Sequence, residues 1–151
     1  METARLGRFV LATDGSEAAG EAVSRGLRLA AAAGARVTVV TVHAAPPDVL
    51  GDADYPRKLA AEAEDALRRV ESALQEAAAL GVEAEGEVFE SEEPATEILR
   101  VADALRAELI VVGSRGLGAV KGAVLGSVSS EVLRRSERPV LVVRHTPPTH
   151  A

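Results

Sequence analysis

The chain has 151 residues and a formal net charge of −6, from 17 Lys and Arg against 23 Asp and Glu. It contains no cysteine and only 2% aromatic residues, which excludes disulfides, thiolate metal sites and aromatic platforms for single-stranded nucleic acid. The acidic balance argues against a nucleic-acid partner, and no signal peptide or bilayer-length apolar run is found, so a cytoplasmic protein without a membrane partner is expected.

The length predicts a single domain over residues 1–151, with an ordered core over about 7–145 and a flexible tail over 146–151. Its predicted elements alternate between strand and helix. In chain order they are a strand over 9–13, a helix over 17–33, a strand over 37–42, a loop over 44–54, a helix over 56–80, a strand over 82–89, a helix over about 94–105, a strand over 109–112, a helix over 127–135 and a strand over 140–143.

Glycine and proline mark several helix ends. Gly34 and Gly81 follow the first and second helices, and Pro94 suits the first turn of the third. The second helix carries an apolar stripe that should face the sheet, made of Leu59, Ala63, Leu67, Val70, Leu74 and Ala78. The last two strands are apolar at every position, as expected for strands covered on both faces.

This alternation predicts an α/β fold with one open parallel sheet, right-handed crossovers and helices on both faces. In such sheets ligands bind beyond the carboxyl ends of the strands. The loops that begin at Asp14, His43 and Gly113 are therefore the candidate ligand-binding loops.

A glycine-rich segment, residues 113–130, holds five of the 13 glycines and leads from a buried strand into a helix that begins at Ser127. Free amides in the first turn of a helix favour an anion, and the Ser127 hydroxyl lies at the same place. The segment is not a P-loop, because no Gly-Lys pair occurs in the chain. It could instead be a flexible surface loop with a serine helix cap.

The spacing that is present is G-x2-G-x9-G-S, formed by Gly113, Gly116, Gly126 and Ser127. Here the sequence resembles the ATP-binding branch of the universal stress protein family, and the likeness extends from about residue 8 to residue 144. The resemblance implies a Rossmann-like sheet, similar to that of the adenine-nucleotide alpha hydrolases, with strand order 3-2-1-4-5. It also implies a homodimer that pairs through the C-terminal strand.

The resemblance implies a nucleotide site built from matching positions. Asp14 would lie near the ribose and phosphates and help to hold Mg²⁺ or Mn²⁺, and the backbone of Val42 would meet the adenine edge. The full candidate set for binding ATP is Ala12, Thr13, Asp14, Val42, Gly113, Ser114, Arg115, Gly116, Gly126, Ser127, Val128 and Ser129. Asp14 could alternatively do no more than close the Asp-Gly-Ser bend.

The three histidines suggest no metal site, because none has partners at ligand spacing. His43 is expected to face solvent in a loop, and His145 and His150 to lie in the tail without partners at metal-ligand spacing.

Three functions stay open from the sequence. The first is an ATP-binding regulatory or signalling module of the stress response. The second is a slow ATPase or a phosphotransferase that phosphorylates itself on Ser127 or Ser129, although no Walker lysine or evident base is present and no catalytic residue is assigned. The third is a nucleotide-free dimeric domain that binds a protein partner.

Overall fold

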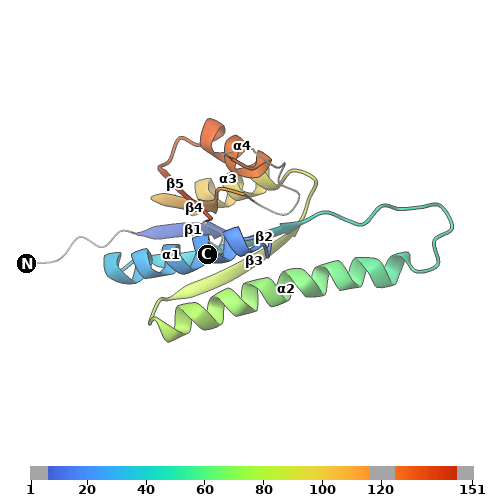
Figure 1. Ribbon diagram of the computed structural model, residues 1–151, viewed down its shortest axis with the longest axis horizontal. Helices are drawn as coiled ribbons and strands as arrows, with labels where there is room; N and C mark the ends of the chain where they lie inside the picture. Colours follow the sequence, from blue (N-terminus) through green and yellow to red (C-terminus); the bar gives the residue numbers. More distant parts are fainter. Residues whose placement is uncertain (1–6, 116–124, 146–151) are drawn as a thin grey trace, which may run out of the picture.

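The computed structural model describes residues 7–115 and 125–145 (Figure 1). Within them, strand and helix alternate as predicted. The elements are β1 (Arg8–Ala12), α1 (Glu17–Ala33), β2 (Arg36–His43), α2 (Tyr55–Ala79), β3 (Ala84–Glu90), α3 (Pro94–Ala104), β4 (Leu109–Gly113), α4 (Ser127–Arg135) and β5 (Val140–Val143).

The five strands form one parallel sheet in the order β3-β2-β1-β4-β5, which confirms the predicted fold class (Figure 1). One apolar core lies between the sheet and the helices α1 and α2, and includes Leu11, Leu27 and Val70. A second core lies between the sheet and α3 and α4, and includes Val10, Ile98 and Val132. All five carboxyl ends therefore meet at one edge of a sheet that is covered on both faces.

The ends of α1 follow from its sequence. The hydroxyl of Ser16 accepts a hydrogen bond from the amide of Ala19 (3.2 Å), which caps the first turn. Gly34 ends the helix in the left-handed conformation, with φ 69°, as predicted. A Cβ on Gly26 would lie 2.9 Å from Cδ2 of Leu11, so this glycine lets α1 pack directly on β1.

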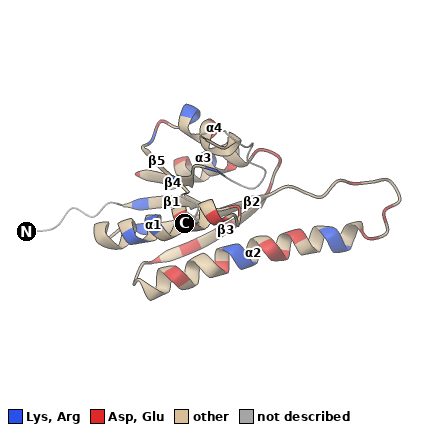
Figure 2. Cartoon of the chain, viewed as in Figure 1, with Lys and Arg blue, Asp and Glu red and all other residues tan. Residues whose placement is uncertain are grey.

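The apolar face of α2 differs from the predicted stripe. Its buried residues are Ala66, Val70, Ala73 and Ala77, whereas Leu67 is 53% exposed and Ala78 is also exposed. The helix lies so close to β3 that a Cβ on Gly86 would overlap Cγ1 of Val70. This close packing selects small side chains and turns the larger leucine outward. Both basic and acidic residues are distributed along α2 (Figure 2).

The start of β3 was placed two residues too early by the sequence pattern. The amide of Val82 still bonds to the carbonyl of Ala77 (2.9 Å), so this residue belongs to the turn that ends α2. The strand begins only at Ala84, which pairs with Val37 of β2.

The expectation that both of the last strands are covered on both faces holds for β4 but is wrong for β5 in the single chain. β5 is an edge strand of the sheet, and Leu141 is 36% exposed. The residues on either side of it, Val140 and Val142, are only half-buried.

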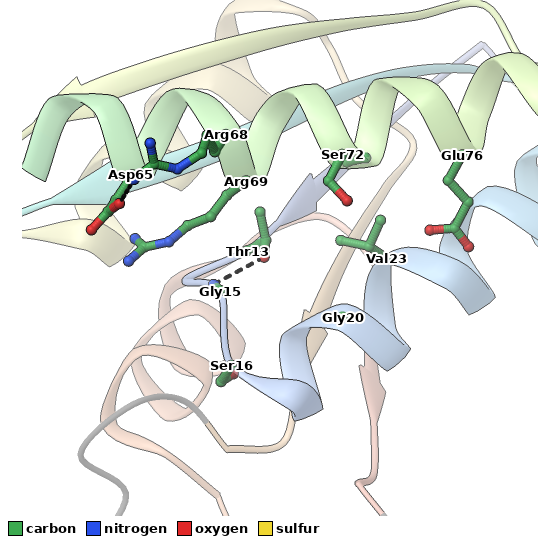
Figure 3. Close-up of a pocket in the computed structure, with 11 residues that line it drawn as sticks. Thr13, Gly15, Ser16, Gly20, Val23, Asp65, Arg68, Arg69, Ser72 and Glu76 are labelled. Carbon is green, nitrogen blue, oxygen red and sulfur yellow. Dashed lines mark hydrogen bonds and ion pairs between the residues drawn. The ribbon is translucent and has the colours of Figure 1, made fainter.

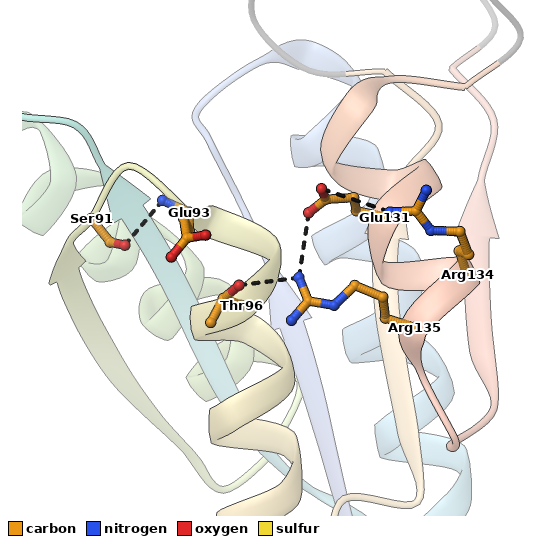
Figure 4. A network of polar contacts seen from close by, with 6 residues as sticks. All are labelled: Ser91, Glu93, Thr96, Glu131, Arg134 and Arg135. Atoms are coloured by element: carbon orange, nitrogen blue, oxygen red, sulfur yellow. Dashed lines mark hydrogen bonds and ion pairs between the residues drawn. The ribbon is translucent and has the colours of Figure 1, made fainter.

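The helices α3 and α4 are joined by polar contacts (Figure 4). Nη1 of Arg135 donates to the hydroxyl of Thr96 (3.1 Å) and lies 3.5 Å from a carboxylate oxygen of Glu131. Ahead of α3, the hydroxyl of Ser91 accepts a hydrogen bond from the amide of Glu93 (3.0 Å). This bond orders the turn before Pro94, which contains no glycine. The helices of the described residues include none that is both long and apolar enough to cross a membrane.

Candidate functional site

The turn after β1 is held by its own side chains. The amide of Thr13 bonds to the carbonyl of Val40 (3.0 Å), which extends the pairing with β2 by one residue. The amide of Gly15 then donates to the hydroxyl of Thr13 (3.2 Å), and the amide of Ser16 donates to Oδ1 of Asp14 (2.9 Å). Gly15 has φ 84°, a conformation that favours glycine. The Asp14 carboxylate thus shapes the turn at the carboxyl end of β1, as the Asx alternative proposed.

The backbone of Val42 points toward the end of β1. Backbone groups in a parallel strand alternate between the two neighbouring strands. The carbonyl of Val40 accepts from Thr13 on the β1 side, and that of His43 accepts from Ser91 on the β3 side. Val42 therefore directs its N–H and C=O to the β1 side, where strand pairing stops at Val40. The N–H and C=O of Val42 thus lie beyond the last β1–β2 pair and form a peptide edge beside the turn that contains Asp14.

Ser114 joins three segments at the end of β4. Its amide donates to the carbonyl of Val143 in β5 (2.8 Å), and its carbonyl accepts from the amide of Gly126 (2.6 Å). Its side-chain hydroxyl accepts from the amide of His145 (3.3 Å). Ser114 is 4% exposed, so its polar groups hold the site together from inside.

The start of α4 presents main-chain amides at the same edge. Gly126 is the N-cap residue, and no side chain of the described residues caps the helix. The first amide to bond within the helix is that of Ser130, which donates to the carbonyl of Gly126 (3.0 Å). Among the described residues, no acceptor is found for the amides of Ser127, Val128 and Ser129.

The two candidate phosphate-accepting hydroxyls differ in their surroundings. Ser127 is exposed, whereas Ser129 is 6% exposed and donates its hydroxyl to the carbonyl of Gly113. The Ser129 hydroxyl is therefore committed to linking α4 to β4.

The structure brings eleven of the twelve candidate binding residues to the carboxyl edge of the sheet. Ala12 ends β1 and is followed by Thr13 and Asp14, Val42 is the last residue but one of β2, and residues 113–115 and 126–129 surround the β4–α4 connection. The hydroxyl of Thr41 donates to the carbonyl of Thr13 (3.0 Å) and so ties the β2 and β1 parts together. Gly116 lies outside the described residues, as do the predicted tail residues 146–151.

A groove between α1 and α2, with a volume of about 410 Å³, opens beside the same turn (Figure 3). Thr13, Gly15 and Ser16 line it from the β1–α1 turn, and Arg69, Ser72 and Glu76 line it from α2. Nothing in the sequence pointed to this groove. Its α2 residues lie more than fifty positions from the turn and look like the ordinary polar face of an amphipathic helix.

One expectation for the histidines was wrong. His43 is 8% exposed rather than solvent-facing, because it ends β2 inside the sheet. His145 lies beside two carboxylates that the sequence did not indicate: Nδ1 lies 3.2 Å from Oε1 of Glu21 and Nε2 lies 3.6 Å from Oε2 of Glu17. Both glutamates belong to α1, so His145 links the end of β5 to that helix.

Comparison with known proteins gives a consistent result. A model of the universal stress protein family matches residues 6–144. A universal stress protein of Thermus aquaticus is 40% identical over 137 residues, which cover 90% of this chain and 97% of the relative. A solved universal stress protein in complex with cAMP is 30% identical, covers 95% of this chain and 99% of its own, and gives a TM-score of 0.71. The UspA structure from Lactobacillus plantarum gives a TM-score of 0.82 at 24% identity, with 93% and 99% coverage, and supports the fold.

Proposed function

Because the chain belongs to the universal stress protein family, we propose that it is a regulatory module that binds an adenine nucleotide, with ATP as the preferred ligand. The observation that carries this proposal is the set of amides at Ser127, Val128 and Ser129, for which no described residue is an acceptor. Amides at a helix start, together with the helix dipole, bind phosphate oxygens regardless of the net charge of the protein.

The adenine would lie against the peptide edge of Val42. An adenine ring offers a donor and an acceptor side by side, which complement one C=O and one N–H of a strand that has lost its neighbour. The solved relative in complex with cAMP supports a ligand of the adenylate class. Thr13 and Asp14 lie between the two halves of this site and would flank the ribose.

We propose that Asp14 also contacts the divalent ion that accompanies the phosphates. Mg²⁺ is usually bound by one or two carboxylates together with substrate phosphates and waters. Asp14 supplies a carboxylate at the carboxyl end of β1, on the turn that its Oδ1 helps to hold. The ion would draw the phosphate chain toward β1 and neutralise part of its charge.

We further propose that the functional unit is a homodimer that pairs through β5. Among the described strands, this one has β4 on one side and none on the other, and an unpaired strand edge invites pairing with a second chain. The half-exposed residues of β5 provide the apolar surface that such an interface would bury.

The test is mass spectrometry of nucleotide that co-purifies with the protein, followed by calorimetry with ATP and Mg²⁺. Gly126→Val places a branched side chain at the N-cap beside the three amides, and should weaken ATP binding at least about tenfold. The matched control is Ser130→Val, which adds the same side chain at an exposed position of α4. Wild-type protein that gives no heat with ATP, ADP or AMP would refute the proposal, and ATP turnover in the same samples would favour an enzyme instead.

A further inference from the structure

The groove between α1 and α2 contains a cation for which the described residues provide no counterion. Arg69 is half-buried, and it is the one partly buried arginine in the described parts of the chain for which no hydrogen bond or ion pair is found. Its neighbour Arg68 also lines the groove but is paired with Asp65. Partial burial of a guanidinium without a partner costs free energy unless an anion binds to it.

The position of Arg69 is fixed by the β1–α1 turn. A Cβ on Gly15 would lie 2.5 Å from Nε of Arg69 and 3.2 Å from its Cζ, so the guanidinium rests directly on this glycine (Figure 3). With φ 84°, Gly15 combines a left-handed turn with space for the arginine. A cation from α2 is thereby held against the turn that contains Asp14.

Hydroxyl groups that line the same groove as Arg69 are available as donors. The hydroxyl oxygen of Thr13 accepts from the amide of Gly15, and that of Ser16 accepts from the amide of Ala19. A hydroxyl that accepts from the backbone keeps its own proton to donate elsewhere. Ser72 adds a third hydroxyl on the α2 side of the groove (Figure 3). Hydroxyl donors that line the same groove as a guanidinium suit an oxyanion with many acceptor positions, which is the chemistry of phosphate.

The rest of the groove restricts where the anion lies. Glu76 lines the opposite end, two helical turns along α2 and so about 10 Å from Arg69. Gly20 leaves the α1 side open, since a Cβ there would meet no atom within 4 Å. The volume of about 410 Å³ is within the usual range for small-molecule sites.

We propose that the α1–α2 groove is a phosphate-binding subsite in which Arg69 is the charged ligand-binding residue. The phosphate group can belong to the nucleotide of the proposed function or to a separate phosphorylated molecule. In the first case the subsite rests on the proposed function, and in the second it is independent of it. Both sources share the same chemistry, a phosphate beside a guanidinium over the turn at Gly15.

The test measures binding of ATP, adenosine and inorganic pyrophosphate to the full chain by calorimetry. Arg69→Gln removes the charge at similar length, and Arg57→Gln is the matched control at an exposed arginine of α2 that does not line the groove. Gly20→Leu narrows the groove from the α1 side at a position with open space. Circular dichroism of each variant checks that it is folded.

We expect Arg69→Gln to weaken binding of ATP or pyrophosphate about tenfold while binding of adenosine stays within twofold, and Arg57→Gln to change binding of none of the three. Gly20→Leu should weaken the same ligand as Arg69→Gln. A loss for ATP identifies the nucleotide as the source of the phosphate, and a loss for pyrophosphate alone identifies a separate molecule. Pyrophosphate binding that depends on Arg69, in a protein that binds neither ATP nor adenosine, supports the subsite while refuting the proposed function.

The subsite is overturned if Arg69→Gln binds ATP and pyrophosphate as the wild type does, or if the wild type binds neither. ATP binding that is lost in Gly126→Val but unchanged in Arg69→Gln would uphold the nucleotide site and reject the groove.

Discussion

A β-carbon built on Gly113 would lie 3.0 Å from the carbonyl oxygen of Ala18. Gly113 ends β4 and Ala18 lies in the first turn of α1, so the strand and the helix backbone meet here without a side chain between them. The first glycine of the G-x2-G-x9-G-S spacing therefore has a packing role of its own, independent of any ligand.

Replacing Gly113 with valine should lower the free energy of unfolding by about 1–3 kcal/mol, because the added side chain must push the α1 backbone away from β4. Urea denaturation measures the effect. The control is Gly20→Ala, where the new methyl group meets open space and the better helix propensity should leave the stability unchanged or raise it by up to about 1 kcal/mol. A Gly113→Val protein as stable as the wild type would show that α1 adjusts freely.

The contact between Gly86 and Val70 should behave as a coupled pair. Gly86→Ala alone should destabilise the protein, because its Cβ would overlap Cγ1 of Val70 and force α2 away from β3. In a Val70→Ala background this atom is absent, so the same change should cost much less. A double-mutant cycle in urea measures the coupling, and strictly additive free energies would contradict the close approach.

The pKa of Asp52 should lie below its ordinary value of about 3.9, because Nζ of Lys58 lies 2.8 Å from Oδ2 and the amide of Asp54 donates to Oδ1. With a folded-state pKa below the unfolded one, the stabilisation is present above about pH 4 and is lost as the pH falls through the folded-state value. Carboxyl NMR titration should show the pKa rise in Lys58→Met. It should not rise in Arg57→Met, whose guanidinium lies 3.8 Å from Asp54 instead.

A charge at the free edge of the sheet should separate the proposed dimer. Leu141→Glu places a carboxylate on β5 and should shift the mass in solution to that of one chain at micromolar concentration, measured by light scattering. Leu80→Glu is the control, because Leu80 is similarly exposed (40% against 36%) but follows α2. A wild-type protein that is already monomeric would remove the basis for this interface.

Much of the fold could be predicted because its signals are local. The Ser16 cap and Gly34 define α1 within a few residues, and alternation of strand and helix leaves few topologies. The stripe on α2 was only partly right, since the burial of Ala66 and the exposure of Leu67 depend on how closely the helix approaches Gly86. That distance is set by a strand that follows later in the chain.

In the candidate site, too, the local signals could be predicted and the contacts between distant segments could not. The glycine spacing located the β4–α4 connection, but not that the Ser114 carbonyl takes up the amide of Gly126. The carboxylates beside His145 come from a helix more than 120 positions earlier. Arg69 could not have been singled out, because its neighbour Arg68 is chemically identical and differs only in the direction in which the helix presents it.

The buried residues of α2 begin at Ala66, so the turns from Tyr55 to Asp65 extend past the part of the helix that packs on the sheet (Figure 1). Unwinding these turns would break backbone hydrogen bonds without exposing the apolar interior. Amide protons there should exchange with solvent by local opening, whereas those near Val70 should exchange only through global unfolding. A single continuous helix would then show two protection levels, and an added peptide segment would be tolerated at its beginning far better than at its middle.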